Sequence, residues 1–176
     1  MEVQPNSNSE KPTRITIIFP TNAYFMSGIR DFTLTMIKNM TQFSDQWAYR
    51  FQSVVDELCN NAIEHGSASG QEVKISFLSI PGKYIEIIVE DSGTGKSKLK
   101  ANDIINLVAQ RKQPGYAFTE LRGRGLPKIV GEWTDEMEFI DRPEGGLSVR
   151  VRKVLRPEDA KKINALVQDP THLVLA

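Results

Sequence analysis

The sequence has almost no cysteine, no surplus of either charge and no long hydrophobic run. Its single cysteine, Cys59, excludes an intrachain disulfide and suits a reducing compartment. Lysine plus arginine number 22, as do aspartate plus glutamate, so the basic surplus of a general nucleic-acid binder is missing. No apolar run reaches the ~18 residues that a membrane-spanning helix needs. We therefore expect a cytoplasmic protein that contacts neither a membrane nor nucleic acid directly.

The length and composition are those of one globular domain. The 176 residues are enough to bury about two-thirds of the unfolded surface, and 40% of them are hydrophobic. Residues 1–12 are polar and lack the basic stretch and apolar core of a secretory signal, so we expect a disordered tail there. The predicted domain spans residues 13–155, and residues 156–176 are expected to form a C-terminal helix or tail.

Hydrophobic periodicity predicts both strands and helices. Alternating or β-branched apolar residues predict strands at residues 14–19, 72–80, 84–90, 136–140 and 147–155. Apolar residues at helical spacing predict helices at residues 24–40, 46–65, 102–110, 125–132 and 157–167. Turn residues at 81–83 and 142–146 predict two hairpins. Residues 96–122 are polar and too long for an ordinary connection, which indicates a functional loop.

The helix predicted at residues 46–65 separates its polar and apolar residues. In VVDELCNNAIEHG at 54–66, apolar and polar residues come in alternating pairs, which at about 100° per residue form two opposite faces. Glu57 and Asn61 are four residues apart and therefore stack on the polar face. A carboxylate and an amide oxygen so placed suit a hard cation, and the carboxylate can accept a proton from a hydroxyl. Taken alone, this segment is more typical of a solvated helix face.

Two glycine-containing segments follow. After the strand at residues 84–90 comes Asp91-Ser-Gly-Thr-Gly95, where glycines let a flat ligand approach and Asp91 can accept a hydrogen bond from the amine of adenine. The alternative is an ordinary turn. Further on, Arg-Gly-Arg-Gly-Leu at 122–126 opens a predicted helix whose N–H groups, dipole and arginines favour phosphate. The alternative is a capped surface helix, because a lone Gly-x-Gly is weak evidence.

Taken in order, the three segments resemble the GHKL nucleotide-binding family of gyrase, Hsp90, histidine kinases and MutL. Glu-Leu-Cys-Asn-Asn-Ala-Ile-Glu-His at 57–65 resembles the asparagine box of the bacterial anti-sigma factor serine/threonine kinases. Leu-Arg-Gly-Arg-Gly-Leu at 121–126 resembles their second glycine box. The resemblance covers roughly residues 13–155. It implies an α/β (α+β) two-layer sandwich, in which a mixed β-sheet carries helices on one face.

The resemblance also implies a role for each matched position. Glu57 matches the general base that activates the hydroxyl of a protein serine or threonine, and Asn61 matches the asparagine that coordinates Mg²⁺. Asp91 matches the aspartate that reads adenine. The residues expected to contact the nucleotide are Asn61, Asp91, Gly93, Gly95, Arg122, Gly123, Arg124, Gly125 and Leu126. Residues 96–122 match the ATP lid, although Lys96 stands where the family often has an apolar residue, and we expect it to be solvated.

The implied function is that of an ATP- and Mg²⁺-dependent protein serine/threonine kinase acting as an anti-sigma factor. Such proteins bind a sigma factor and phosphorylate an anti-sigma-factor antagonist, and the family suggests a homodimer. The alternatives are a nucleotide-binding partner-switch module with little or no kinase activity, a histidine-kinase-like ATPase domain, and a small α/β domain with no nucleotide site. The two histidines, His65 and His172, do not lie on the two-helix hairpin of a self-contained histidine kinase.

Overall fold

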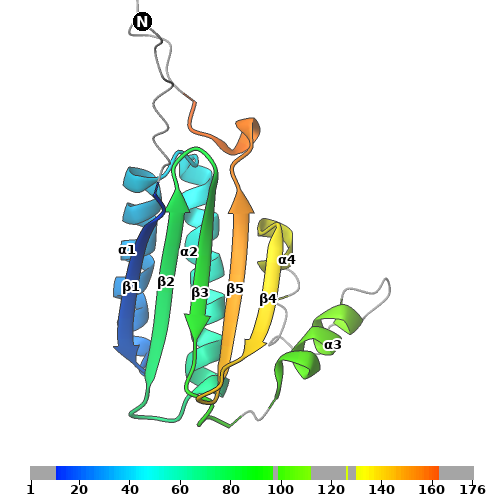
Figure 1. Ribbon diagram of the computed structural model, residues 1–176. Coiled ribbons are helices and arrows are strands. Elements are labelled where there is room, and N and C mark those ends of the chain that lie inside the picture. The colour runs from blue at the N-terminus through cyan, green and yellow to red at the C-terminus, as the bar shows by residue number, and fades with distance from the viewer. Residues whose placement is uncertain (1–10, 97–98, 112–125, 127–129, 163–176) are drawn as a thin grey trace, which may run out of the picture.

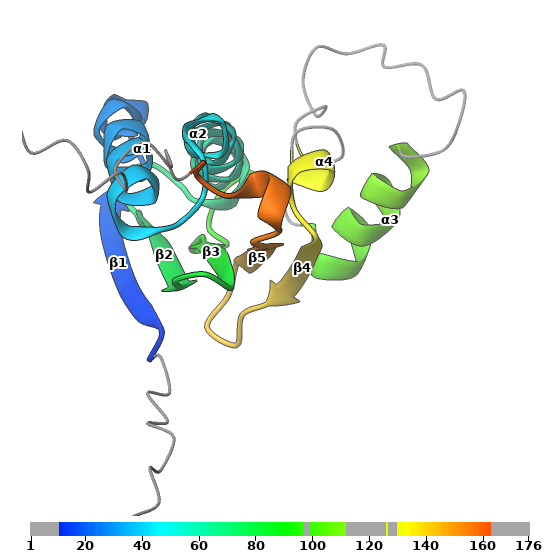
Figure 2. The same cartoon turned by 90° about the horizontal axis from the view of Figure 1, so that it is seen from above.

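The structure is a computed structural model that describes residues 11–96, 99–111, 126 and 130–162. A β-sheet forms one layer, and helices cover one of its faces (Figures 1 and 2). The strands are β1 (Thr13–Pro20), β2 (Glu72–Ile80), β3 (Tyr84–Glu90), β4 (Glu136–Asp141) and β5 (Leu147–Val154). The helices are η1 (Ala23–Phe25), α1 (Met26–Met40), α2 (Asp45–Asn61), η2 (Ala62–Gly66), α3 (Ala101–Arg111), α4 (Gly131–Trp133) and η4 (Pro157–Asp159). The predicted α/β fold class is confirmed.

The sheet has the strand order β1-β2-β3-β5-β4, and every pairing between these strands is antiparallel. The expectation of a mixed sheet is therefore wrong for the described strands. Short turns join β2 to β3 and β4 to β5, which makes those pairs antiparallel. Helices α1 and α2 run along the sheet and back, so β2 starts at the end where β1 finishes, with Pro20 opposite Glu72.

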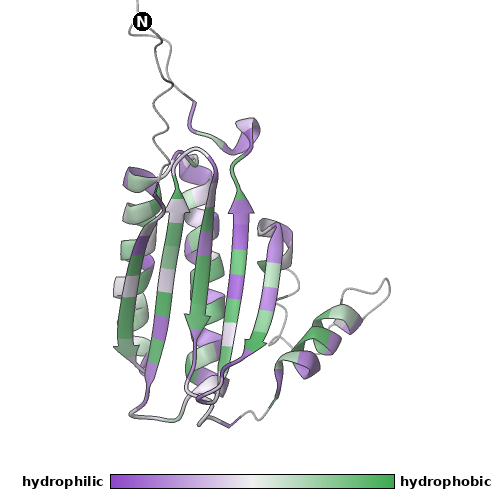
Figure 3. Cartoon of the chain, viewed as in Figure 1, coloured by the Kyte–Doolittle hydropathy of each residue, from purple (hydrophilic) through white to green (hydrophobic). Residues whose placement is uncertain are grey.

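The hydrophobic core lies between the sheet and the helix pair α1–α2. Every second residue of the central strands faces the helices and is almost completely buried, as in Val73, Ile75 and Phe77 of β2. Figure 3 shows the same alternation of polar and apolar residues along the strands. Cys59 of α2 is fully buried in this core, and burial, with a smaller contribution from Asp56, raises the pKa of its thiol to about 12. It is a core residue, as predicted.

The segment after β5 differs from its prediction. Instead of a helix over residues 157–167, the chain makes one 3-10 turn, Pro157–Asp159, and the extended Ala160 then forms an isolated bridge with the loop between α1 and α2. The indole Nε1 of Trp47 donates a hydrogen bond to Asp159 Oδ1 at 2.7 Å. These tertiary contacts hold the turn in place and stop helix propagation. The rest of the predicted helix lies outside the described residues.

Three further predictions concern segments that are described in full or in part. The helix predicted at residues 102–110 is confirmed as α3. Of the helix predicted at residues 125–132, the structure describes only Leu126 and the residues from Val130 onward, where α4 covers Gly131–Trp133. The tail predicted at residues 1–12 lies almost wholly outside the described residues. Within the described part of the chain, no helix is both long and apolar enough to span a membrane.

Candidate functional site

The polar face of α2 carries the predicted pair of side chains in direct contact. The amide Nδ2 of Asn61 donates a hydrogen bond to Glu57 Oε1 at 3.0 Å, and both residues are half-buried. Val55 and Cys59 on the opposite side are buried in the core, which fixes the rotation of the helix. Because the amide nitrogen faces Glu57, the amide oxygen of Asn61 is left as a ligand for a cation.

Helix α2 ends in a π-helical turn, η2, at Ala62–Gly66. The backbone N–H of Ser67 closes this turn by donating to the carbonyl of Ala62 at 2.9 Å. Such turns are rare and occur often at functional sites. The turn brings Gly66 to the loop after β3, where its carbonyl accepts a hydrogen bond from the N–H of Gly95 at 3.1 Å. Gly66 ends the helix as predicted, whereas the change to π geometry had no signal in the sequence.

Asp91 opens the loop after β3 and is only 8% exposed. Its Oδ1 accepts hydrogen bonds from the backbone N–H groups of Gly93, at 2.8 Å, and Leu147, at 3.2 Å. Gly93 has φ +68°, a conformation that favours glycine. The other carboxylate oxygen, Oδ2, accepts no hydrogen bond from the described residues. The carboxylate is thus held by the backbone through one oxygen, while the second remains an acceptor.

Hydroxyl groups tie this loop to the end of α2. Ser67 Oγ accepts a hydrogen bond from the N–H of Ser92 at 2.9 Å, and Thr94 Oγ1 accepts one from the N–H of Ala68 at 3.0 Å. The hydroxyls of Ser92 and Thr94 are themselves 2.6 Å apart. The sequence did not predict these hydrogen bonds, because a serine or threonine in a turn carries no signal that it bonds to a distant segment.

The hairpin turn between β4 and β5 forms the third side of the site. Gly145 and Gly146 have φ +103° and +85°. A guanidinium nitrogen of Arg142 donates a hydrogen bond to the backbone carbonyl of Asp91, and its Nε lies 3.4 Å from a carboxylate oxygen of Glu90. The sequence predicted a hairpin turn at residues 142–146 but not that this turn would contact the loop after β3. The glycine pair was the available signal.

The remaining predicted site residues are only partly described. The structure does not describe Arg122, Gly123, Arg124 and Gly125. It also does not describe the part of the predicted lid, residues 96–122, that follows α3. Leu126 is half-buried and packs against the hydrophobic core, and Lys96 is exposed, as expected. The structure therefore brings together Glu57 with Asn61, and Asp91 with Gly93 and Gly95. The phosphate-binding roles at residues 122–126 stay predictions.

An open cavity of about 580 Å³ lies beside the loop after β3. Its lining includes Thr21 at the end of β1, His65 and Ser67 at the end of α2, and Thr94 and Gly95. The described residues that line the cavity do not include Glu57, Asn61 or Asp91. The cavity is thus a neighbour of the predicted site, with which it shares Gly95.

The fold, in which the end of α2 meets the loop after β3, is that of a kinase-like ATPase domain. The chain belongs to the histidine kinase-like ATPase domain family, whose model matches residues 19–153, from the end of β1 to the end of β5. This match supports the GHKL resemblance and, with it, ATP as the ligand. A search among curated proteins finds no significant match.

Proposed function

We propose that this chain is an ATP- and Mg²⁺-dependent protein serine/threonine kinase that acts as an anti-sigma factor. The observation that carries the proposal is the Glu57 carboxylate, held 3.0 Å from the Asn61 amide on the polar face of α2. A module that only bound nucleotide would not need a proton acceptor beside its cation ligand. The alternative, a nucleotide-binding partner-switch module with little or no kinase activity, would use the same fold and would not require that carboxylate.

The proposed adenine end of the site is the loop after β3. Oδ2 of Asp91 accepts a hydrogen bond from the 6-amino group of adenine, while Oδ1 stays bonded to the backbone. Gly93 and Gly95 let the flat base approach the chain. The residues proposed to bind the phosphates are those of the helix start predicted from the sequence: Arg122, Gly123, Arg124, Gly125 and Leu126.

The proposed cation ligand is the amide oxygen of Asn61. Mg²⁺ usually takes one or two protein ligands and completes its shell with water and phosphate oxygens, and a single amide oxygen beside a carboxylate fits this habit. When bound, the ion neutralises charge on the phosphates. The hydrogen bond from Nδ2 to Glu57 orients the amide of Asn61, whose oxygen would hold the ion.

Glu57 is proposed as the general base for phosphoryl transfer. Its carboxylate takes the proton from a serine or threonine hydroxyl of the acceptor protein. The hydroxyl oxygen forms a bond to the terminal phosphorus as the bond from that phosphorus to ADP breaks. Most of the remaining acceleration comes from positioning and charge neutralisation, as is general for this reaction. The proposed acceptor is an anti-sigma-factor antagonist, a sigma factor is the proposed binding partner, and the family suggests a homodimer.

The deciding experiment separates binding from transfer. ATP is titrated calorimetrically into the protein with and without Mg²⁺, and transfer of labelled phosphate to a purified antagonist protein is then measured. We expect Glu57→Gln to keep ATP affinity and to lower the transfer rate by about 10²–10⁴-fold. The matched control is Glu158→Gln, an exposed carboxylate of η4.

The outcomes distinguish the candidates. Tight, magnesium-dependent binding with no transfer by the wild type would favour the partner-switch module. Wild-type transfer rates in the Glu57→Gln protein would remove the general-base role from this residue. Transfer to a histidine of the acceptor rather than to a serine or threonine would favour the histidine-kinase-like alternative.

A further inference from the structure

We propose that Gly66 is a positioning residue for recognition of the nucleobase. Because this residue has no side chain, the Asp91 carboxylate can occupy the position from which its free oxygen reads the 6-amino group of adenine. The inference rests on the proposed function, in which Asp91 binds the adenine of ATP. The inference adds Gly66, at the end of α2, to the residues of the loop after β3 that are proposed to bind adenine.

The contact between the two residues is very close. A Cβ atom built on Gly66 would lie 2.4 Å from both Cγ and Oδ2 of Asp91, and 2.6 Å from its Cβ. Non-bonded carbon atoms pack best at about 3.5–4.0 Å, so any side chain at position 66 must displace a neighbour. The carbonyl of Gly66 is bonded to the N–H of Gly95, which holds the backbone in place. The group that moves is therefore the carboxylate.

Backbone conformation does not explain the glycine at position 66. Gly93 and Gly146, which lie on the same cluster of loops, have φ +68° and +85°, where only glycine is unstrained. Gly66 is not among the residues with positive φ. At Gly95 the nearest atoms to a built Cβ are backbone atoms, beginning with the carbonyl oxygen of His65 at 2.2 Å. At Gly66 they belong to the side chain that the proposed function assigns to adenine.

The carboxylate is confined from both sides. Oδ1 is bonded to the N–H groups of Gly93 and Leu147, and a Cβ on Gly146 would lie 2.6 Å from this oxygen. Gly66 faces the opposite edge of the same group, next to Oδ2. A side chain at position 66 would thus act on the oxygen that is left for the ligand. The π turn of η2 is what brings Gly66 to this place.

The test uses two nucleotides that differ at the recognised group. ITP has a carbonyl where ATP has the 6-amino group, so it offers Asp91 no donor at the 6-position. We expect wild-type protein to prefer ATP. Gly66→Ala should weaken ATP binding by about tenfold or more, the size expected for a lost hydrogen bond to a charged group, and leave ITP binding nearly unchanged. General damage to the site would instead weaken both nucleotides alike.

The matched control is Gly28→Ala on α1, where a built Cβ would meet nothing within 4 Å. This variant should keep both affinities, measured by calorimetry with Mg²⁺ present. Asp91→Ala supplies the reference for complete loss of the preference. If wild-type protein does not bind ATP, the proposed function fails. If it binds ATP and the Gly66→Ala protein keeps the same preference over ITP, only the role of Gly66 is overturned.

A second variant covers the case in which Gly66→Ala does not fold, as judged by circular dichroism. Asp91→Gly removes the three atoms nearest to a Cβ built at position 66. The double variant Gly66→Ala, Asp91→Gly should then fold like Asp91→Gly alone. Continued unfolding of the double variant would show that residue 66 acts on something other than the carboxylate, and would overturn the inference.

Discussion

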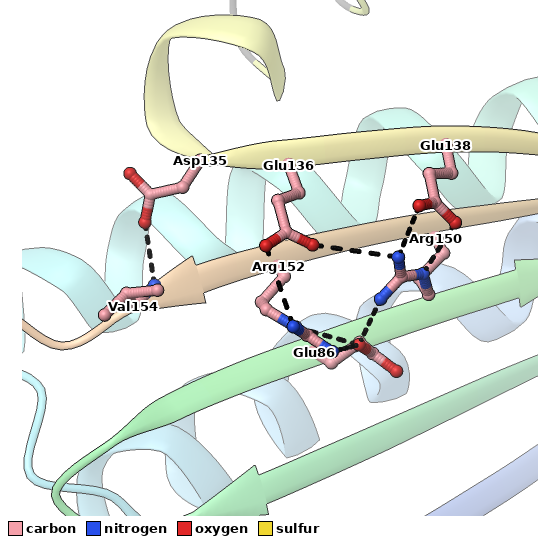
Figure 4. A network of polar contacts seen from close by, with 7 residues as sticks. All are labelled: Glu86, Asp135, Glu136, Glu138, Arg150, Arg152 and Val154. Carbon is pink, nitrogen blue, oxygen red and sulfur yellow. Dashed lines mark hydrogen bonds and ion pairs between the residues drawn. The ribbon is translucent and has the colours of Figure 1, made fainter.

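Two groups of charged side chains in this molecule are held in opposite ways. On the sheet face that the helices leave uncovered, Glu86, Arg150 and Arg152 neutralise one another, with Glu136 and Glu138 at the rim (Figure 4). Glu86 is only 6% exposed and accepts hydrogen bonds from both arginines, at 2.7 to 3.1 Å. At the end of the sheet near η2, Asp91 is equally buried, but backbone N–H groups hold it through one oxygen.

The difference separates a structural carboxylate from one that is prepared for a ligand. In the network of Figure 4, the buried charge of Glu86 meets two opposite charges, Arg150 and Arg152, which compensate it although all their hydrogen bonds go to one oxygen, Oε2. The Asp91 carboxylate forms no ion pair with a described side chain, since Arg142 bonds to the backbone carbonyl of this residue and the carboxylate is held by backbone N–H groups. Burial by itself therefore does not identify a site. The groups that bond to the buried carboxylate distinguish a ligand-binding site from a structural one.

The largest expected effect is on ligand binding at Asp91. Asp91→Ala should weaken ATP binding by about 10- to 150-fold, which corresponds to about 1.5–3 kcal/mol for a hydrogen bond to a charged group. Calorimetric titration with ATP and Mg²⁺ measures this loss, and a denaturant titration checks that the protein remains folded. Unchanged ATP affinity in a folded Asp91→Ala protein would mean that Asp91, like Glu86, is a structural carboxylate and does not bind the ligand.

The opposite outcome is expected at Glu86. Glu86→Ala should lower the free energy of unfolding by about 1–3 kcal/mol, because Arg150 and Arg152 lose a shared buried partner. ATP affinity should stay at the wild-type level, since the network faces away from the helices. Urea denaturation and calorimetry on the same preparation measure both quantities. A large loss of ATP affinity would link the network to the site and break the comparison.

The smallest effect is a pH dependence at Asp135, next to the network (Figure 4). Burial alone would raise the pKa of this carboxyl, but hydrogen bonds from the Val154 N–H and Arg156, with the charge of Lys153, lower it overall. A lowered pKa contributes stability above the ordinary value of about 3.9, and this stability is lost as the pH falls through the lowered value. Asp135→Asn should thus be less stable than wild type at pH 7.

Urea denaturation of the two proteins between pH 7 and pH 2 tests the sign of this effect. The difference in unfolding free energy should shrink below about pH 4, as the wild-type carboxyl becomes protonated. A difference that persists unchanged in acid would attribute the loss to packing rather than to charge.

Local patterns in the sequence were sufficient for most of the elements. The bounds predicted for β2 and β3, residues 72–80 and 84–90, are confirmed, because strict alternation ends at Pro81-Gly82-Lys83. The contact of Glu57 with Asn61 followed from helical spacing alone. The closing helix predicted at residues 157–167 is wrong for the described residues 157–162, because helical spacing carries no information on the hydrogen bond from Trp47 to Asp159.

The sequence by itself determined which residues are apolar, where turns fall and which side chains share a helix face, since each depends on neighbours a few positions apart. Only the tertiary structure decided that Gly66, Asp91 and Gly146 meet, and that Arg142 bonds to the carbonyl of Asp91. These contacts join the end of α2, the loop after β3 and the β4–β5 turn. Their distances depend on strand order and on the π turn, neither of which is encoded in a local pattern.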